Sequence, residues 1–328
     1  MKLFSACRAA ILVAVFLVAP LSSRAAPPPG WPASLTIATA SPGGVFLIYG
    51  QAMAQIFTEA LGIPVSAQVT QGSGQNILMI EGGNAQLALV STDVALDGWN
   101  GEGAWTRNKK LRSLRALLPM YDAPLVLVTL KTSGINSWPD AAGKRIAGGP
   151  PGSAAQIVAK AFDALGIQAT WRNGAYDVLS KQLQAGVVDA LVSTIAAPAP
   201  ALTELDQTGE IQFVPLSAGE IAKLCTAMPQ FSPSVVPGGT YPTMKSDYMT
   251  VGWFNFVVAS KDLPDDLVYA IVKSFYANHA RMVQAHASAR ESVVANLKRN
   301  TFIPYHPGAA RYYKEIGIAI PANLAKPE

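Results

Sequence analysis

The pentapeptide ALVST occurs twice in this chain, at residues 88–92 and again at residues 190–194. Two shorter matches precede it in both copies. A Gly-Gly pair (43–44) recurs after 105 residues, and LGI (61–63) recurs after 104 residues. A repeat at a nearly fixed interval indicates that one structural unit is used twice. The sequence therefore predicts two similar lobes.

Each copy of the repeat alternates strand-like and helix-like patterns. The strands are expected at 35–40, 63–70 and 85–90 in the first copy and at 145–149, 167–172 and 189–194 in the second. Glycine-rich turns follow the first strand of each copy, and helices are expected over 45–61 and 154–165. This alternation is typical of α/β lobes with mainly parallel sheets, whose ligands bind beyond the carboxyl ends of the strands.

Two long apolar segments are predicted to cross between the lobes. They are MYDAPLVLVTL (120–130) and SDYMTVGWFNFVVAS (246–260). We therefore expect a first lobe made of 27–124 with 251–328 and a second lobe made of 125–250. Two crossings form a hinge that can close on a ligand.

Residues 1–26 have the pattern of a secretory signal peptide. Lys2 and Arg8 lie beside an apolar run over 9–19, and SRA (23–25) resembles a cleavage site, so cleavage is expected near Ala25 or Ala26. The run is shorter than the roughly 20 residues that a membrane-spanning helix needs. The mature chain is predicted to be exported.

Charge and cysteine content exclude several classes of function. Removing the signal leaves 22 basic and 21 acidic residues, without the basic patch of a nucleic-acid-binding protein. Cys225 is then the one cysteine, and the chain has three histidines, so neither an internal disulfide nor a metal site is predicted. No basic residue lies between Arg24 and Arg107, so an anion bound to that part of the chain would have to be held by backbone amides and hydroxyls.

The turn RIAGGPPGS (145–153) resembles a phosphate loop at first sight. A nucleotide loop needs a lysine after its last glycine, and the dinucleotide fingerprint needs G-x-G-x-x-G; the turn has neither. Ser153 is a favourable N-cap for the following helix, whose free amides would attract a small anion. The alternative is an ordinary turn between a strand and a helix.

Seven segments together resemble the TAXI-type solute receptors of TRAP transporters. They are SPGGVFLIYG (41–50), QGSGQN (71–76), GNAQLALVSTDVA (83–95), INSWPDAAGKRIAGGPPGS (135–153), VVDAL (187–191), VPGGTY (236–241) and IPYHPGAARYYKE (303–315). The resemblance covers nearly all of the mature chain. It implies a type II periplasmic-binding-protein fold and a monomeric periplasmic receptor without enzymatic activity or cofactor. Such a receptor delivers a small organic acid to a TRAP-type permease, which an ion gradient drives.

The sequence departs from this family's pattern at two places. Thr-Tyr-Tyr usually follows the first Gly-Gly, where this chain has VFL (45–47), and Gln usually precedes a small polar residue and Asp, where it has STD (91–93). Side chains that would orient a glutamate-like ligand are therefore missing. We expect a more apolar carboxylate, aromatic or branched.

The candidate ligand-binding residues lie in the glycine-rich turns and at the strand ends. They are Ser41, Gly43, Gly44, Val45, Phe46, Ser73, Asn76, Ser91, Thr92, Gly152, Ser153, Ala154, Arg172, Thr194 and Tyr241. Helix-terminal amides and hydroxyls would hold the carboxylate. Arg172 is the one cation expected near the cleft, with a solvated loop position as its alternative. Trp171, Tyr176 and Trp253 are expected either to wall the ligand or to pack in the core.

Two other functions stay open at this point. The protein could present its closed form to a membrane sensor without any transport. It could also be an enzyme on the same two-lobed fold, which would need a nucleophile or an acid–base pair in the cleft. Cys225 is the one thiol available, and it falls within a predicted helix.

Overall fold

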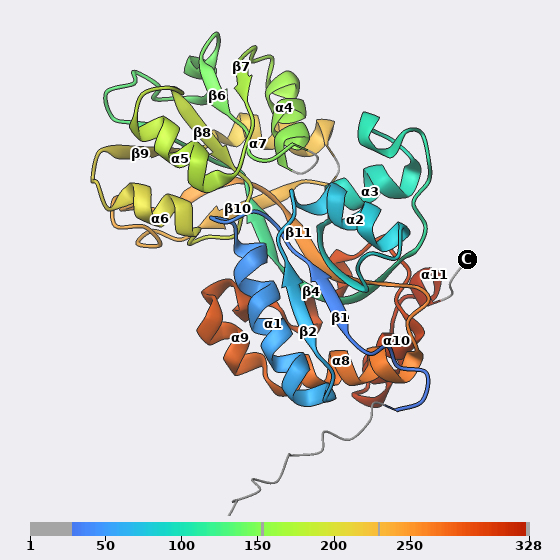
Figure 1. Cartoon of the computed structure of the whole chain (residues 1–328). Coiled ribbons are helices and arrows are strands. Elements are labelled where there is room, and N and C mark those ends of the chain that lie inside the picture. The colour runs from blue at the N-terminus through green and yellow to red at the C-terminus, as the bar shows by residue number, and fades with distance from the viewer. Residues whose placement is uncertain (1–27, 152–153, 229, 326–328) are drawn as a thin grey trace, which may run out of the picture.

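The chain forms two lobes, each built around a mixed β-sheet with helices on both faces (Figure 1). The structure is a computed structural model that describes residues 28–151, 154–228 and 230–325. The predicted signal peptide, Gly152 and Ser153 lie outside these ranges. The architecture confirms the predicted fold class of two α/β lobes joined by two crossing strands.

The first sheet has six strands in the order β10-β11-β3-β1-β2, with β4 also paired to β11. These strands are β1 (Leu35–Ala38), β2 (Val65–Gln68), β3 (Leu87–Ser91), β4 (Leu114–Pro124), β10 (Ser232–Val236) and β11 (Tyr248–Ser260). β1 runs parallel to β2 and β3. Helix α1 (Val45–Leu61) joins β1 to β2, and α2 (Ser73–Glu81) joins β2 to β3. Because the two crossovers run in opposite directions along the sheet, they lie on opposite faces (Figure 1).

The second sheet has five strands in the order β7-β6-β8-β5-β9. These strands are β5 (Val126–Leu130), β6 (Arg145–Ala147), β7 (Thr170–Arg172), β8 (Ala190–Ser193) and β9 (Ile211–Val214). β6 runs parallel to β7 and β8. Helices α4 (Ala154–Leu165) and α5 (Tyr176–Gln184) connect them. The order β8-β6-β7 reproduces the order β3-β1-β2, so the two copies of the repeat fold alike.

The prediction of mainly parallel sheets was wrong. β11 pairs antiparallel with β3, β4 and β10, and β5 pairs antiparallel with β8 and β9. The parallel pairs lie within the repeats, β1 with β2 and β3 and β6 with β7 and β8, since helices cross back between these strands. β11 in the first sheet and β5 in the second run against the strands of the repeats. Because β4 and β10 pair with β11, and β9 pairs with β5, these further pairs are antiparallel as well.

The two crossing segments lie side by side. β4 pairs with β11, and the segment predicted as one strand over 120–130 is divided at Leu125 into β4 and β5. The Leu125 backbone amide donates to the carbonyl of Val251 at 2.8 Å, so the crossing strands stay connected at the division. β10 lies within 125–250 yet joins the first sheet, while Ala123 and Trp253 pack in a second-lobe core cluster.

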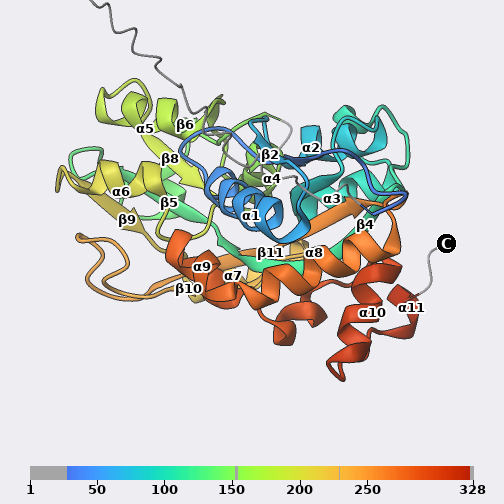
Figure 2. The same ribbon diagram turned by 60° about the horizontal axis from the view of Figure 1, so that its bottom comes forward.

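The other helices cover the sheets and close their ends. They are α3 (Thr92–Asn100), α6 (Pro200–Asp206), α7 (Ala218–Ala227), α8 (Asp265–Ala277), α9 (His279–Ala285), α10 (Pro307–Glu315) and α11 (Ala322–Ala325), with short 3-10 turns at Ala104–Thr106, Trp138–Ala141, Ala287–Glu291 and Val294–Arg299. Figure 2 shows α8 to α11 gathered on one side of the first lobe. Among the described residues, no helix has the length and apolar character needed to cross a membrane.

Each lobe has its own buried core. The largest cluster fills the first lobe around side chains such as Phe57, Phe256 and Phe275, which are fully buried. Two further clusters occupy the second lobe. Burying one such side chain contributes about 1.5–3 kcal/mol, so each lobe is a rigid support for the loops that face the other.

Candidate ligand-binding site

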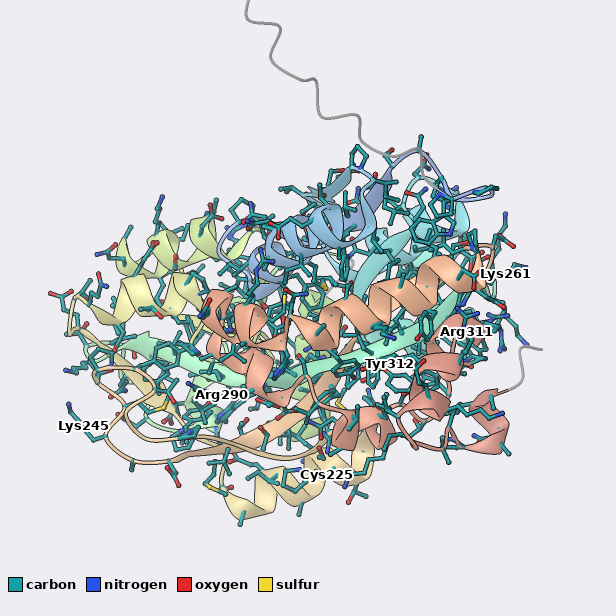
Figure 3. All side chains as sticks on the ribbon, turned by 90° about the horizontal axis from the view of Figure 1, so that it is seen from below. Cys225, Lys245, Lys261, Arg290, Arg311 and Tyr312 are labelled. Atoms are coloured by element: carbon teal, nitrogen blue, oxygen red, sulfur yellow. The ribbon has the colours of Figure 1, made fainter. Side chains whose placement is uncertain are left out.

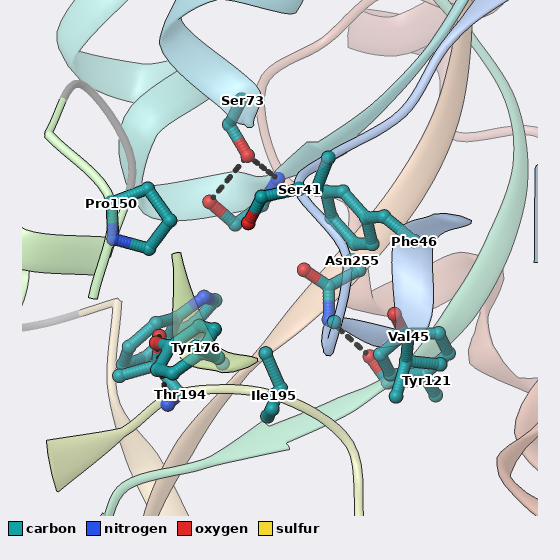
Figure 4. A pocket seen from close by; sticks show the side chains of 14 residues that line it. Ser41, Val45, Phe46, Ser73, Tyr121, Pro150, Tyr176, Thr194, Ile195 and Asn255 are labelled. Carbon is teal, nitrogen blue, oxygen red and sulfur yellow. Dashed lines mark hydrogen bonds between the residues drawn. The ribbon is translucent and has the colours of Figure 1, made fainter. Parts of the chain in front are cut away.

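A pocket lies between the lobes, at the carboxyl ends of the parallel strands (Figure 4). Its walls come from both repeats and from both crossing strands. The lining residues are Ala40, Ser41, Gly44, Val45, Phe46, Ser73, Ser91, Tyr121, Pro150, Tyr176, Thr194, Ile195, Trp253 and Asn255. This position is where ligands of open α/β sheets bind.

The first repeat contributes a pair of hydroxyls. Ser73, the first residue of α2, and Ser91, the last residue of β3, have their Oγ atoms 3.2 Å apart. The Ser73 oxygen also accepts the Ser91 backbone N–H at 3.0 Å. Only one hydroxyl hydrogen can lie between two oxygens. The pair therefore has one further hydrogen, for which a ligand competes with the neighbouring Asp93 carboxyl, a hydrogen-bond partner of Ser91.

The second repeat contributes the equivalent pair. Tyr176, the first residue of α5, and Thr194, just after β8, have their hydroxyl oxygens 3.3 Å apart. The Tyr176 oxygen also accepts the Thr194 backbone N–H at 3.3 Å. Burial raises the pKa of Tyr176, so its hydroxyl stays protonated near neutral pH. By the same count, this pair has one hydrogen left to donate.

Ser41 and Trp253 add two more hydrogen-bond donors. Ser41 is 5% exposed and Trp253 is 2% exposed, and neither the Ser41 Oγ nor the Trp253 Nε1 has a hydrogen-bond partner among the described residues. Trp253 is held by stacking on Phe231, with ring centroids 5.1 Å apart. A buried donor without a partner costs about 1–3 kcal/mol, which a ligand acceptor can recover.

The pocket therefore offers four side-chain donors to an acceptor-rich ligand. An ionised carboxylate has two oxygens with about four lone-pair sites, which matches this number. None of the described side chains that line the pocket is charged. A carboxylate bound there would be held by neutral donors alone.

Three helices begin at the pocket. α1 starts at Val45, α2 at Ser73 and α5 at Tyr176, and the N-cap residue of none of the three makes a side-chain capping bond. In the first turn of α5 the Asp177 carboxylate accepts the Val178 N–H at 2.9 Å, so the starts of α1 and α2 are the more open of the three. Their first backbone N–H groups and helix dipoles favour negative charge at this place. The contribution of α5 was not expected from the sequence, which suggested the turn before α4 instead.

Seven of the residues selected from the sequence line the pocket. They are Ser41, Gly44, Val45, Phe46, Ser73, Ser91 and Thr194. Gly152 and Ser153 lie outside the described residues, and Ala154 is the first residue of α4. Gly43 does not line the pocket but lies beside it, against the second lobe. A Cβ on Gly43 would be 2.8 Å from the backbone nitrogen of Asp177, so the lobes can approach this closely only at a glycine.

Asn76 and Thr92 have structural roles away from the pocket. The Asn76 amide nitrogen donates to the carbonyls of Thr39 at 2.6 Å and Leu89 at 2.7 Å, and its oxygen accepts from Thr70. These bonds use both amide hydrogens and tie α2 to β3 and to the chain segments that follow β1 and β2. The Thr92 hydroxyl donates to the carbonyl of Phe254 at 2.9 Å, because α3 begins at Thr92 and turns it away.

Arg172 and Tyr241 also lie away from the pocket. Arg172 is an exposed residue at the end of β7, which agrees with the alternative of a solvated arginine. Tyr241 is 1% exposed and stacks on Phe213, with ring centroids 4.9 Å apart. Its hydroxyl accepts the backbone N–H of Ala199 at 2.8 Å, so it belongs to the second-lobe core. Of the three aromatic residues considered as ligand walls, Tyr176 and Trp253 line the pocket.

Sequence analysis missed Asn255, Tyr121, Pro150, Ile195 and Ala40, all of which line the pocket. Asn255 and Tyr121 lie on the crossing strands, which were interpreted only as connections. One signal was available: Asn255 is an amide in the middle of the apolar segment VGWFNFVV (251–258). A polar side chain in a buried strand needs a partner and is therefore a candidate site residue.

Contacts between the lobes show a closed arrangement. Lys160 of α4 pairs with Asp97 of α3 at 3.1 Å. His286, just after α9, contacts the carbonyl of Pro198 through Nε2 at 2.9 Å. Its Nδ1 accepts the Ser288 backbone N–H, so Nε2 carries the hydrogen and donates it. Burial lowers the pKa of His286, which favours this neutral form.

Residues suited to catalysis or metal binding are not grouped at the pocket. Among the described residues, no cluster of three or more His, Cys, Asp and Glu side chains could hold a metal ion. Cys225 lies on α7 and does not line the pocket (Figure 3). Burial raises the pKa of its thiol, which disfavours the reactive thiolate.

Known proteins resemble this chain along most of its length. The periplasmic binding protein BugD is 16% identical over 87% of this chain and 98% of its own, with a TM-score of 0.53. A periplasmic transporter is 12% identical over 87% of this chain and 92% of its own, with a TM-score of 0.52. An ancestral arginine-binding protein bound to arginine is 14% identical over 79% of this chain and 96% of its own, with a TM-score of 0.48. The model of the NMT1-like family matches residues 37–317. The chain therefore belongs to the NMT1-like family.

Proposed function

We propose that this protein is an extracytoplasmic receptor that binds a small organic monocarboxylate in the pocket between its lobes. The observation that carries the proposal is the set of four neutral donors in a pocket whose described side chains are uncharged. The Ser41 hydroxyl and the Trp253 indole N–H have no partner among the described residues, and each hydroxyl pair has one hydrogen beyond the one that it shares. Hydrogen bonds to a charged group are roughly twice as strong as neutral ones. The starts of α1, α2 and α5 add favourable backbone amides.

The rest of the pocket favours an apolar body on the ligand. Val45, Phe46, Pro150 and Ile195 line it. A second carboxylate, as in glutamate, would meet these apolar side chains without a cation to balance its charge. Burying an unpaired charge is strongly unfavourable. A branched or aromatic monocarboxylate is the better match.

Binding is proposed to use the division into lobes at 124/125 and 250/251. Closure brings the hydroxyl pair of the first repeat toward that of the second, so the ligand joins the lobes. Release then requires opening about the crossing strands β4 and β11. A monomeric receptor of this kind, exported by its predicted signal peptide to the periplasm, would deliver the acid to a TRAP-type permease. The TAXI-like segments of the sequence support this partner. A membrane sensor is the other recipient to be tested.

The test is a binding panel on the refolded, ligand-stripped mature protein. Isovalerate, phenylacetate, glutamate and arginine are compared by thermal shift and calorimetry, with isovaleramide as the neutral analogue of isovalerate. A ligand at 100 times its Kd adds about 2.7 kcal/mol, and each kcal/mol shifts Tm by roughly 2–4 °C. We expect shifts with the monocarboxylates and none with the amide. Tighter binding of glutamate, or no binding of any acid, would contradict the proposal. Chemical conversion of a bound acid would favour the enzyme alternative.

A further inference from the structure

Asn255 differs from the other polar residues of the pocket in what it can offer a ligand. It lies on β11, is 2% exposed and lines the pocket. Its amide nitrogen donates to the backbone carbonyl of Tyr121 at 3.1 Å. Figure 4 shows the amide oxygen on the other side of the group, directed into the pocket.

The orientation of this amide is set by its partner. If the amide were turned over, its oxygen would face the Tyr121 carbonyl oxygen, and two acceptors would oppose each other. The oxygen therefore stays toward the pocket. No described residue donates a hydrogen bond to it. Unlike the serine and threonine hydroxyls nearby, an amide oxygen can only accept.

The register of the sheet places Asn255 close to the proposed carboxylate position. Asn255 of β11 is the direct antiparallel partner of Ser91 of β3. Directly opposed residues have Cβ atoms about 4.5–5.5 Å apart and point to the same face. Trp253, with its unpartnered indole N–H, lies two residues earlier on the same face of β11. The acceptor and two sources of donors therefore surround one small volume.

We propose that Asn255 is a specificity-determining residue, and that the ligand is a 2-hydroxycarboxylate whose hydroxyl donates to the Asn255 oxygen. This inference rests on the proposed function, since it assumes that the donors bind a carboxylate. Because Asn255 lies directly opposite Ser91, its amide oxygen is placed to accept from a hydroxyl on the carbon next to the carboxylate. An ammonium in the same place has three hydrogens to donate, and the Asn255 oxygen accepts one of them. Among the described residues, no charged side chain lines the pocket to balance it, so amino acids are disfavoured.

The first experiment compares four acids with the same carbon skeleton on the wild-type protein. They are 2-hydroxyisovalerate, isovalerate, 2-oxoisovalerate and valine, measured by calorimetry. We expect 2-hydroxyisovalerate to bind about 10- to 100-fold more tightly than isovalerate or the oxo acid, because these leave the buried acceptor unsatisfied. Equal binding of the hydroxy acid and isovalerate would overturn the inference and leave the proposed function intact. Tightest binding of valine would also overturn it. Binding of none of the four would overturn both.

The second experiment uses Asn255→Leu, which keeps a similar volume and removes the acceptor. We expect isovalerate and 2-hydroxyisovalerate to bind this variant within about 3-fold of each other, because the selective group is gone. Thr92→Val is the matched control, since the Thr92 hydroxyl contacts the same strand but lies off the pocket. It should keep the wild-type preference. A preference retained in Asn255→Leu would contradict the assignment. The wild-type comparison still decides the question if this variant does not fold.

Discussion

The two copies of ALVST place hydroxyl pairs on opposite sides of one pocket, yet they do so with different residues. In the first lobe the pair is Ser73 with Ser91, and in the second it is Tyr176 with Thr194. Both pairs join the first residue of a helix to the end of a strand 18 positions later. In both, the helix residue also accepts the backbone N–H of its partner.

The copies differ in which residue of the pentapeptide reaches the pocket. After β3 the chain enters α3 at Thr92, so the last pocket hydroxyl is that of Ser91. After β8 the chain continues as a loop, and Thr194 reaches the pocket, while the buried Ser193 hydroxyl has no partner within the described part of the chain. A repeated sequence therefore fixes the position of the strand end. The path of the chain beyond it decides which side chain binds.

The largest expected loss of ligand affinity comes from Gly43, one of the glycines that follow the first strand of each copy. Gly43 has φ +83° and faces Asp177 of the other lobe, whereas Gly149 has φ +85° and faces Tyr176 of its own lobe. Gly43→Ala should prevent closure, because its Cβ would meet a backbone nitrogen at 2.8 Å that no side-chain rotation can relieve. We expect affinity for the acid to fall by about 100-fold or more as the closed form becomes rare. Calorimetry measures this loss.

Gly62→Ala is the control for Gly43→Ala. Gly62 has φ +72°, so the alanine suffers the same backbone strain, but a Cβ there meets nothing within 4 Å. It should lower stability slightly and leave affinity within about 2-fold of wild type. Equal affinity losses in the two variants would mean that strain, not the contact between lobes, explains the effect of Gly43.

The sequence predicted the parts of this comparison that depend on local pattern. Strand and helix periodicity located β1 to β3 and β6 to β8, and the glycine turns led to Val45 and Phe46. The sequence does not distinguish a polar side chain that binds a ligand from one that, like Asn76, makes its hydrogen bonds to other parts of the protein. The type of residue is the same in both cases, and only the tertiary partners differ.

Long-range pairing accounts for what the sequence did not predict. β4 and β11 are separated by more than a hundred residues, so their antiparallel contact has no local signal. Tyr121 and Asn255 reach the pocket only through that pairing. Of the hydroxyl pair in the second lobe, the sequence pointed to Thr194 as a ligand-binding residue. Tyr176 was considered only as an aromatic wall, because a tyrosine at the start of a helix does not resemble the serine at the equivalent position of the first copy.

The residue after each ALVST copy gives the second comparison. Asp93 follows the first copy and Ile195 the second, and of these two only Ile195 lines the pocket. Asp93 is 4% exposed, and its Oδ1 has no partner among the described residues. Desolvation raises the pKa of this carboxyl to about 6, against the opposing hydrogen bonds of Ser91 and the Val94 amide. Its ionised form therefore destabilises the folded protein.

The sign of the pH effect follows from that raised pKa. Above pH 6 the folded protein carries the full penalty of a buried charge, and the penalty is relieved as the pH falls from 6 toward 4, because the folded state then binds the proton first. Asp93→Asn should stabilise the protein at pH 8 by up to about 3 kcal/mol, with the gain vanishing near pH 4. Urea unfolding across this pH range measures the difference. Asp163→Asn, on the exposed face of α4, is the control, because it removes a carboxyl group that lies in solvent. A flat difference for Asp93→Asn would show that its carboxyl is solvated.

The smallest effects should come from the hydroxyl pairs themselves, and they should be strongly non-additive. Each pair shares one hydrogen internally and donates one to the ligand, so removing one hydroxyl leaves the other free to donate. Ser91→Ala and Thr194→Val should each weaken acid binding by less than about 5-fold. Ser73→Ala with Ser91→Ala, or Tyr176→Phe with Thr194→Val, removes a donor to a charged group and should lower the affinity for the acid by about 10- to 100-fold.

Double-mutant cycles for the two pairs should give similar coupling, since the repeats build the same arrangement. Additive losses would mean that both hydroxyls of a pair contact the ligand, and coupling in one pair alone would mean that the carboxylate is bound by a single lobe.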